Sequence, residues 1–532
     1  MRNDGTSAPP LSAVKPWRRL HSRTDVAERD GVLTLIEQVT TPHEAMVDDL
    51  LFVRRALDDA GVHSLLIRGN DERPVLAIDA KSYPAAESAL AEACVEEPFY
   101  AETVRSHDLS RKGEPVLVAD GKLSASKSPR IVRLRRPRLA VNGRYSYRHN
   151  VGVQLEMWRR SGDQIIVPVE NALTRRSLPV DEVVEVTVER YGQTWPTIQH
   201  MFDELASDVN FEIDMVFSWV DGTDKEWQRA RAKRMQSYVV GEGDDSEARF
   251  RQIDELKYAL RSVYMYAPWI RNIYIATDSP RPAWLDEHPR VQLMRSEDFF
   301  EDLSNLPTHN SQAVEAQIHR IPGLSEYYLY SNDDMFFGRP VGPEMFFSPG
   351  GLTKFIEATT RIGLGENNPK RSGFENAARV NRRLLHERFG RVTTRHLEHT
   401  AAPLRKSVVG ALASEFPEEF AKTAASPFRA ADNISVTNSL YHYYALLTGR
   451  AVQKVGAKVL YVDTTMKAGL RSLKTLLRKR DYDFFCLNDG SFPEVTPDER
   501  ARKMRSFLEA YFAIPAPWER PVATSVLDEA AS

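Results

Sequence analysis

Hydrophobic and polar positions follow one clear pattern from Phe211 onward, where short apolar runs of strand length alternate with segments of helical spacing. The run over 211–224 predicts a buried strand that ends in a polar turn. Leu256, Leu260 and Val263 predict a helix over 254–266, which ends before Pro268. Further strands are predicted at 272–278 and 327–330. This alternation predicts an α/β fold, in which helices flank a mixed, mostly parallel sheet.

The part of the chain before residue 206 has a different pattern. Residues 1–30 are polar, contain prolines and lack periodicity, which predicts a disordered tail. Residues 31–125 combine a helical pattern near 47–57, strand-like runs at 63–69 and 73–79, and a helix over 84–92, which predicts a small α+β domain. We interpret 126–205 as a basic linker followed by a β-rich segment, 206–520 as the main domain and 521–532 as a second tail.

A basic stretch between Ser128 and Leu139 leaves two interpretations open. A solvated linker or an edge strand is the simpler one. The alternative is a surface for anionic lipid or for a phosphate-rich acceptor. The stretch contains Arg130, Arg133, Arg135, Arg136 and Arg138.

Composition and charge exclude several classes of protein. The 532 residues include 71 Lys and Arg against 74 Asp and Glu, a formal net charge of -3, so we expect no nucleic-acid partner. The two cysteines, Cys94 and Cys486, predict neither a disulfide framework nor a cysteine zinc site. No apolar run reaches the roughly 18 residues that span a bilayer, and no apolar signal segment follows Arg18 and Arg19. We expect a cytoplasmic protein without a transmembrane segment, and leave open peripheral contact with the inner face of the membrane.

Polar residues follow three of the predicted strands: Asp221 with Gly222, Thr277 with Asp278, and the run 332–334. Ligands of such sheets bind at the carboxyl ends of the strands, so these clusters should converge on one cleft. In the run 332–334, the adjacent carboxylates of Asp333 and Asp334 suit a divalent cation that carries a diphosphate. Ordinary turn chemistry is the simpler interpretation of this acidic run taken alone.

The same part of the chain contains a second candidate. Thr308, Asn310 and Ser311 stand at the start of a predicted helix, where backbone N–H groups and the helix dipole favour an anion such as phosphate. Ordinary helix capping explains them equally well. The order of helix start, aromatic strand and acidic turn within 306–340 favours a functional site.

Four blocks of sequence occur in a recognisable order. They are IDMVFSWVDGTD at 213–224, the segment 249–278 followed by PAWL at 282–285, the segment 306–340, and FFCLND at 484–489 followed by Pro517, Trp518 and Glu519. A connecting stretch over 395–433 is also familiar. From about Phe211 to Glu519 the chain resembles the Stealth family of sugar-phosphate transferases, which includes bacterial capsular polysaccharide phosphotransferases and the animal enzyme that tags lysosomal glycoproteins with N-acetylglucosamine phosphate.

The resemblance implies a nucleotide-sugar transferase-like fold and a phosphotransferase activity. The enzyme would transfer a sugar-1-phosphate from a nucleotide-activated sugar, expected to be a UDP-sugar, to a hydroxyl of a glycan or polysaccharide acceptor. It would release a nucleoside monophosphate in the synthesis of a phosphodiester-linked capsular polysaccharide or exopolysaccharide.

The same resemblance, together with the chemistry of the residues, assigns expected roles. Mg²⁺ or Mn²⁺ would bind Asp333 and Asp334. Phosphate would contact Thr308, Asn310, Ser311, Asn332 and Arg429, with Arg249 and Arg251 as further anion ligands. The nucleotide would lie against Asp221, Gly222 and Asp224, and the catalytic residues would be His396, Asp333, Asp334 and Arg429.

His396 and His399 allow three interpretations. They could be zinc ligands, although no third ligand is obvious nearby, or they could be a solvated or buried pair. One of them could instead activate the acceptor hydroxyl or contact the metal-bound phosphate, because imidazole titrates near neutral pH. The resemblance favours His396.

Two rival functions remain. A metal-dependent glycosyltransferase of the same architecture would move the sugar without phosphate and release a nucleoside diphosphate. A catalytically inactive protein would bind the nucleotide or the glycan without turnover.

Overall fold

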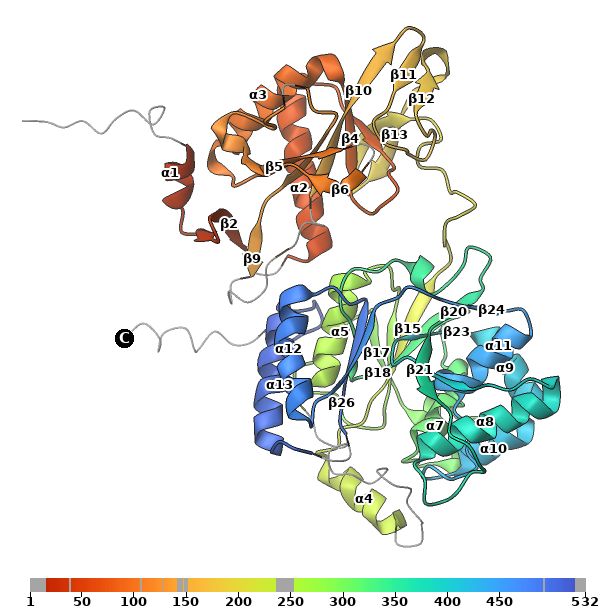
Figure 1. Ribbon diagram of the computed structural model, residues 1–532. Helices are drawn as coiled ribbons and strands as arrows, with labels where there is room; N and C mark the ends of the chain where they lie inside the picture. Colours follow the sequence, from red (N-terminus) through yellow and green to blue (C-terminus); the bar gives the residue numbers. More distant parts are fainter. Residues whose placement is uncertain are drawn as a thin grey trace, which may run out of the picture. The chain divides into compact units, whose positions relative to one another are not determined.

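The computed structural model describes residues 16–37, 40–105, 108–126, 128–140, 147, 152–235, 253–490 and 493–521. The chain forms two compact units, Met1–Glu204 and Leu205–Ser532, and Figure 1 shows the elements of each. The division falls next to the boundary expected at residue 206. Each unit has its own hydrophobic core.

The first unit is an α+β structure built on a nine-stranded sheet. Helices α2 (Pro42–Asp59) and α3 (Tyr83–Ala93) bury their apolar faces against this sheet. A main path of six strands runs in the order β12-β11-β10-β8-β5-β6, while β3 and β4 join at β10 and β7 joins at β5. These strands are β3 (Leu65–Ile67), β4 (Val75–Asp79), β5 (Tyr100–Arg105), β6 (Asp108–Lys112), β7 (Val116–Leu117), β8 (Ile131–Arg135), β10 (Val153–Ser161), β11 (Gln164–Ile166) and β12 (Ser177–Pro179).

Smaller elements complete this unit. Two of them lie within residues 1–30, for which the sequence predicts a disordered tail. Helix α1 (Pro16–His21) and strand β1 (Val26–Arg29) are ordered because Leu20 and Val26 pack against Tyr100 and Ala119. Residues 1–15 lie outside the described part of the chain. Strand β1 pairs with β2 (Val32–Glu37), β2 pairs with β9 (Arg138–Ala140), and β13 (Glu185–Arg190) forms a hairpin with β14 (Gln193–Ile198).

The division predicted between 31–125 and 126–205 is not seen. Strand β10 pairs in parallel with β4, and β8 pairs with β5, so both segments belong to one sheet. Most of the basic stretch is therefore not a linker, because β8 lies between β5 and β10, whereas Arg138 and Leu139 belong to β9, an edge strand of the smaller sheet. Its arginines have partners within the unit, which removes the reason for proposing a lipid surface: Arg130 with the Val167 carbonyl, Arg133 with Gln154, Arg135 with Glu102, and Arg136 and Arg138 with Asp49.

The second unit has the predicted α/β fold. Its five-stranded sheet has the order β17-β16-β15-β18-β23, in which the first four strands are parallel and β23 is antiparallel to β18. The strands are β15 (Ile213–Ser218), β16 (Ile273–Ala276), β17 (Val291–Met294), β18 (Tyr327–Asn332) and β23 (Ala402–Arg405). Helix α5 (Glu255–Tyr266) is amphipathic and begins within one residue of the predicted position.

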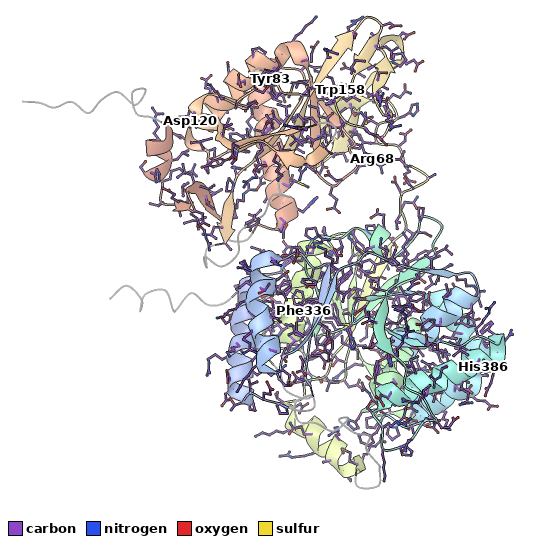
Figure 2. All side chains as sticks on the ribbon, viewed as in Figure 1. Arg68, Tyr83, Asp120, Trp158, Phe336 and His386 are labelled. Carbon is purple, nitrogen blue, oxygen red and sulfur yellow. The ribbon has the colours of Figure 1, made fainter. Side chains whose placement is uncertain are left out.

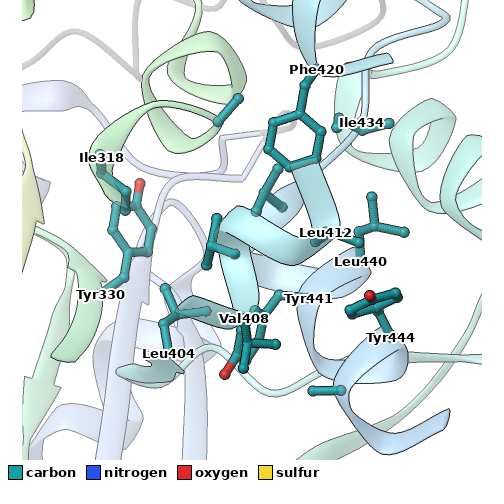
Figure 3. Close-up of a cluster of buried hydrophobic side chains, with 14 of the residues drawn as sticks. Ile318, Tyr330, Leu404, Val408, Leu412, Phe420, Ile434, Leu440, Tyr441 and Tyr444 are labelled. Carbon is teal, nitrogen blue, oxygen red and sulfur yellow. The ribbon is translucent and has the colours of Figure 1, made fainter. Parts of the chain in front are cut away.

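Helices lie on both sides of this sheet (Figure 1). On one side α5 lies with α12 (Lys467–Lys479) and α13 (Pro497–Tyr511). The other side has α7 (Ser311–Glu315), α8 (Gly373–Phe389), α9 (Lys406–Glu415), α10 (Pro417–Ala425) and α11 (Tyr441–Leu447). The core between β18, α9, α10 and α11 contains Tyr330, Leu412 and Tyr441 among its buried side chains (Figure 3).

Short sheets extend the second unit beyond the central one. Strand β26 (Phe484–Asn488) lies between β19 (Met335–Phe337) and β25 (Val459–Asp463). Strand β20 (Thr353–Phe355) pairs with β24 (Ala451–Gln453), and β21 (Glu357–Arg361) pairs with β22 (Arg395–Leu397). Two shorter helices are α4 (Lys225–Met235) and α6 (Ser296–Phe299). None of the helices described is both long enough and apolar enough to cross a bilayer.

Candidate active site

Three strands bring polar residues to one edge of the central sheet, as the sequence predicts. Ser218 at the end of β15 stands level with Ala276 of β16 and with Asn332 of β18. The loops that follow β15 and β16 are joined directly, because the backbone N–H of Asp221 donates to Ser279 Oγ at 2.8 Å. The segments containing Asp221, Asp278 and Asp333 therefore meet where ligands of α/β sheets bind.

The acidic turn between β18 and β19 is attached to a distant part of the sequence. The Asp334 carboxylate accepts hydrogen bonds from the Cys486 thiol at 3.5 Å and from Asn488 Nδ2 at 3.3 Å. The Asp334 backbone carbonyl accepts from the Leu487 N–H at 2.9 Å. Strand β26 thus holds the turn from the side opposite to β18.

Negative charge is concentrated around this turn. Burial raises the pKa of the Asp333 carboxyl well above its ordinary range, and the carboxylates of Glu255, Asp334 and Asp489 raise it further. Glu255, the first residue of α5, is itself buried, and burial raises its pKa to about 7. Asp489 is paired with Arg500. A cation placed here would relieve the repulsion between these carboxylates.

The acidic turn fits one kind of metal site. Within the described ranges, no cluster of three or more His, Cys, Asp or Glu residues could hold a metal by itself. Mg²⁺, however, is usually held by one or two carboxylates while waters and substrate phosphates fill the other positions. The adjacent oxygen donors of Asp333 and Asp334, with the raised pKa of Asp333, match this second arrangement.

The loop after β15 is held in a compact turn by hydrogen bonds between its own residues. Asp221 Oδ1 accepts from the backbone N–H of Thr223 at 2.9 Å and from its hydroxyl at 2.6 Å. Asp224 Oδ1 accepts from the Glu226 N–H at 2.8 Å, at the start of α4. These bonds explain the Asp-Gly-Thr-Asp sequence as a shaped turn at the sheet edge. The other two candidates for this region, Arg249 and Arg251, lie outside the described residues.

The helix start at 308–311 differs from the prediction. Helix α7 spans only Ser311–Glu315, and the Asn310 side chain accepts from the Gln312 N–H at 3.1 Å. The Asn310 amide also donates to the Ser426 and Phe428 carbonyls and to Asn433 Oδ1. Asn310 is only 1% exposed. We therefore correct its predicted role: its side chain is used to hold the segment 426–433, because a buried amide must satisfy its hydrogen bonds.

The segment held by Asn310 contains Arg429, which contacts the start of α7. Arg429 Nη2 donates to Ser311 Oγ at 2.7 Å, and the Thr308 hydroxyl accepts from the Asn310 N–H at 3.2 Å. Burial raises the pKa of the Glu315 carboxyl to about 6, while Thr437 and Arg429 act in the opposite direction.

Tyr330 is influenced by the charges both of these residues and of the acidic turn. Burial raises the pKa of its phenol well above the ordinary value, and the charges of Glu315, Arg429 and Asp333 all act on it. The Tyr330 hydroxyl donates to Asn332 Oδ1 at 3.1 Å. Arg429, Asn332 and the acidic turn are therefore parts of one site.

The two histidines lie next to this site. The His399 ring centroid is 5.1 Å from that of Tyr461, a residue of β25 whose phenol is influenced by the charge of Asp334. The His396 ring stacks on Phe374, with 4.6 Å between centroids. Burial lowers the pKa of both imidazoles, and the charge of His396 lowers that of His399 further. The lowered pKa favours the neutral form of each imidazole, which can accept a proton.

Four matched regions and a set of similar proteins give the family. The conserved regions 1, 2, 3 and 4 of Stealth proteins match residues 211–239, 249–355, 398–446 and 474–526. The exopolysaccharide phosphotransferase CpsY of Mycobacterium leprae is 60% identical over 94% of this chain and 91% of its own length. The chain belongs to the Stealth family.

Two further relatives have similar sequences over most of their length. The exopolysaccharide phosphotransferase CpsY of Mycobacterium tuberculosis strain H37Rv is 60% identical over 94% of this chain and 93% of its own length. An exopolysaccharide phosphotransferase of Nocardia farcinica is 52% identical over 91% of this chain and 89% of its own length. A crystal structure of the galactosyltransferase LgtC with donor and acceptor sugar analogues covers 57% of this chain and 96% of its own, with a TM-score of 0.30 and 12% identity, values too low to support an inference.

The Stealth regions meet at the site described above. Region 1 contains the 221–224 loop, region 2 contains Glu255 and the acidic turn, and region 4 contains Asn488 and Asp489. Sequence patterns do not single out Glu255, Tyr461 or Asn488, because an acidic helix start and a strand end look ordinary in isolation. The only available signal was FFCLND at 484–489, which stood out as a block but not as a neighbour of Asp334.

Proposed function

We propose that the protein transfers a sugar-1-phosphate from a nucleotide-activated sugar, expected to be a UDP-sugar, to a hydroxyl of a glycan and releases a nucleoside monophosphate. Its family membership makes it a phosphotransferase of exopolysaccharide synthesis. The observation that carries the more detailed proposal is the acidic turn Asp333–Asp334, held between β18 and β26 at the carboxyl edge of the sheet.

The donor would be held from three sides of this turn. Asp333 and Asp334 would hold Mg²⁺ or Mn²⁺, which when bound neutralises charge on the diphosphate. Arg429, kept in place by Ser311, would bind a phosphate oxygen, with Thr308 and Asn332 nearby. The backbone of the loop containing Asp221, Gly222 and Asp224 would border the nucleotide, since Gly222 has no side chain to prevent close approach.

The chemical step requires a base near the acceptor. The acceptor oxygen would attack the phosphorus that carries the sugar, and its proton would pass to the neutral His396 imidazole. A new bond would form between that phosphorus and the acceptor oxygen, while the bond to the bridging oxygen of the diphosphate breaks. The leaving group is a nucleoside monophosphate. Positioning and electrostatic stabilisation supply most of the rate in such reactions.

The product nucleotide tests this proposal directly. The full chain is incubated with a UDP-sugar, a glycan acceptor and Mg²⁺ or Mn²⁺, and the nucleotides are separated by chromatography. We expect UMP, with phosphorus retained in the glycan. UDP together with a phosphorus-free glycan would establish the rival glycosyltransferase, and binding without either nucleotide would establish an inactive binding protein.

We expect the reaction to take place in the cytoplasm. Cys94 and Cys486 are both buried thiols rather than a disulfide, and the Cys486 thiol takes part in holding the acidic turn. An oxidising compartment is therefore not needed for this structure.

A further inference from the structure

A group of arginines lies on α8 and on the segment before it. We call Arg371, Arg379 and Arg382 the arginine cluster. Arg382 Nη2 donates to the Gly363 carbonyl at 3.2 Å, and a side chain on Gly363 would collide with the guanidinium of Arg379. Arg371 Nη1 donates to the Glu366 carbonyl at 2.7 Å. The exposed loop over 363–366 therefore packs on the cluster, and the absence of a side chain on Gly363 lets its backbone approach the Arg379 guanidinium closely.

Arg379 is the most unusual member of the cluster. It is only 8% exposed, and no acceptor among the described residues lies within hydrogen-bonding distance of its Nε. Nη1 donates to the Glu375 carbonyl at 2.8 Å, and the Glu375 carboxylate is 3.6 Å from Nη1. The neighbouring charges of Arg371 and Arg382 repel the Arg379 guanidinium. A buried guanidinium with an unused donor and two like charges beside it favours an anion.

The cluster adjoins the candidate base. The charges of Arg379 and Glu375 both act on the His396 imidazole. On the same helix, the 39% exposed ring of Phe374 stacks on His396. The acidic turn lies toward the other histidine, through Tyr461 and His399. The Phe374 ring also lies 6.3 Å from the His399 ring, so Phe374, the two histidines and Tyr461 form one group of rings, in which the charge of Asp334 acts on Tyr461 and that of Arg379 acts on His396.

We propose that Phe374 and the arginine cluster bind the acceptor glycan, with the Phe374 ring against a sugar and the cluster on a phosphate group of that glycan. This inference rests on the proposed function, in which His396 activates the acceptor hydroxyl. The part of the acceptor beyond that hydroxyl must then lie on the far side of His396 from the donor. The cluster adjoins His396 through Arg379.

The proposed reaction itself supplies a phosphate-bearing acceptor. Each transfer leaves one phosphodiester in the product, so a glycan made in an earlier round carries an anion that a neutral starting glycan lacks. A cationic subsite beside the base therefore selects a chain that is already being extended. The residues involved lie between the second and third matched regions of the family, over 356–397.

Acceptor kinetics test this selection. The full chain is assayed with a disaccharide joined by a phosphodiester and with its neutral parent disaccharide, at saturating donor. We expect the KM of the phosphodiester acceptor to be lower by roughly tenfold or more, the size expected for charged hydrogen bonds to one phosphate. Arg379→Gln and Arg382→Gln should remove this preference by raising the KM of the phosphodiester acceptor to that of its neutral parent, while leaving the KM of the donor unchanged.

A matched control is available on the same helix. Arg383 is exposed and pairs with Glu387 at 3.6 Å, so Arg383→Gln should keep the preference. If Arg379→Gln unfolds, the less buried Arg371 and Arg382 provide the test, with circular dichroism as the check of folding. Equal KM values for the two acceptors in the unmodified protein, or a preference that survives Arg382→Gln and Arg371→Gln, would overturn the inference.

A binding measurement separates this inference from the proposed function. Titration calorimetry with the phosphodiester disaccharide and with inorganic phosphate measures binding to the arginine cluster without turnover. Release of UMP with no charge preference would leave the proposed function standing and remove the subsite. Arginine-dependent binding of the disaccharide without UMP release would keep the subsite and remove the proposed function. Binding of inorganic phosphate but not of the disaccharide would show an anion site that does not bind the acceptor.

Discussion

Arg261 and Glu519 form a two-pronged ion pair that joins two parts of the chain 258 residues apart. Arg261 Nε donates to Glu519 Oε1 at 2.6 Å, and Nη2 donates to Oε2 at 2.7 Å. The side chains are only 11% and 5% exposed. Helix α5, which carries Arg261, begins at Glu255 beside the acidic turn. The pair therefore fixes the helix that supplies one of the carboxylates of the site.

We expect Glu519→Gln to destabilise the second unit. Removing one partner of a buried ion pair leaves the other charge uncompensated, which costs about 3–5 kcal/mol. Urea unfolding followed by circular dichroism measures this loss as a lower midpoint. The control is Glu499→Gln, because Glu499 forms a more exposed pair with Lys503 one turn away on α13, and exposed ion pairs contribute little to stability. Equal effects of the two changes would contradict the prediction.

We expect Asp334→Asn to lower kcat for nucleoside monophosphate release by about 10² or more while the protein stays folded. The substitution removes a negative charge from the proposed metal and diphosphate site, where transition-state charge is stabilised. The amide can still accept hydrogen bonds from Cys486 and Asn488, so the attachment to β26 is retained. Exposed Asp498 on α13 provides the matched change, since Asp498→Asn alters the same chemical group away from the site. Unchanged turnover in Asp334→Asn would remove the acidic turn from the mechanism.

The sequence predicts the local elements of the site but not their partners. Strands β15, β16 and β18 and helix α5 are visible as apolar runs and helical spacing, because these patterns depend on neighbouring residues. Helical spacing places Arg261 on one helix with Glu255 and Lys257, but it does not reveal a partner on another segment. Its actual partner, Glu519, is brought close by contacts between distant segments, which include the bridge between Leu285 and Glu519 and the bond from the Asp286 N–H to the Trp518 carbonyl. A contact between residues so far apart in the sequence cannot be detected from the local hydrophobic pattern.

Two further differences have the same physical cause. Asn310 stands at a helix start, where an anion could bind. A segment more than one hundred residues away buries it, however, and its amide donates hydrogen bonds to that segment. The arginines of β8 look like a basic surface, but their strand lies inside a sheet that residues 31–125 and 126–205 build together. In each case burial by a distant segment decides the role of a polar side chain.

We expect the buried Glu315 carboxyl to make stability depend on pH. Its pKa is raised from the model-compound value of 4.5 to about 6, chiefly by burial, so the folded state binds its proton more tightly than the unfolded state. The stabilisation from this proton is fully present below pH 4.5 and is lost as the pH rises through about 6. The shift corresponds to roughly 2 kcal/mol.

Replacing Glu315 with Gln isolates this contribution. The amide keeps an oxygen that can accept the hydrogen bond of the Thr437 hydroxyl, seen at 2.8 Å, but it does not titrate. Unfolding free energies from pH 4.5 to 8 should show the unmodified protein losing about 2 kcal/mol relative to Glu315→Gln. The exposed Glu418 on α10 serves as the control, because Glu418→Gln makes the same chemical change at a surface position. A constant difference between the protein and Glu315→Gln over this range would contradict the assigned shift.

We expect His396→Gln to lower kcat by about 10²–10⁴, the range for loss of a general base, and to remove the acidic limb of the pH–rate profile. Burial and the Arg379 charge lower the pKa of His396 below its ordinary 6.5, against the opposing charge of Glu375. In the unmodified protein the rate should therefore fall only as the pH drops below 6.5. His399→Gln separates the two histidines, since that variant should keep the acidic limb if His396 is the base. His386 is exposed on α8, the helix that carries Glu375 and Arg379 (Figure 2). Replacing His386 should change neither kcat nor the pH–rate profile. An acidic limb that persists in His396→Gln and disappears in His399→Gln would assign the base to His399, the ring that contacts Tyr461.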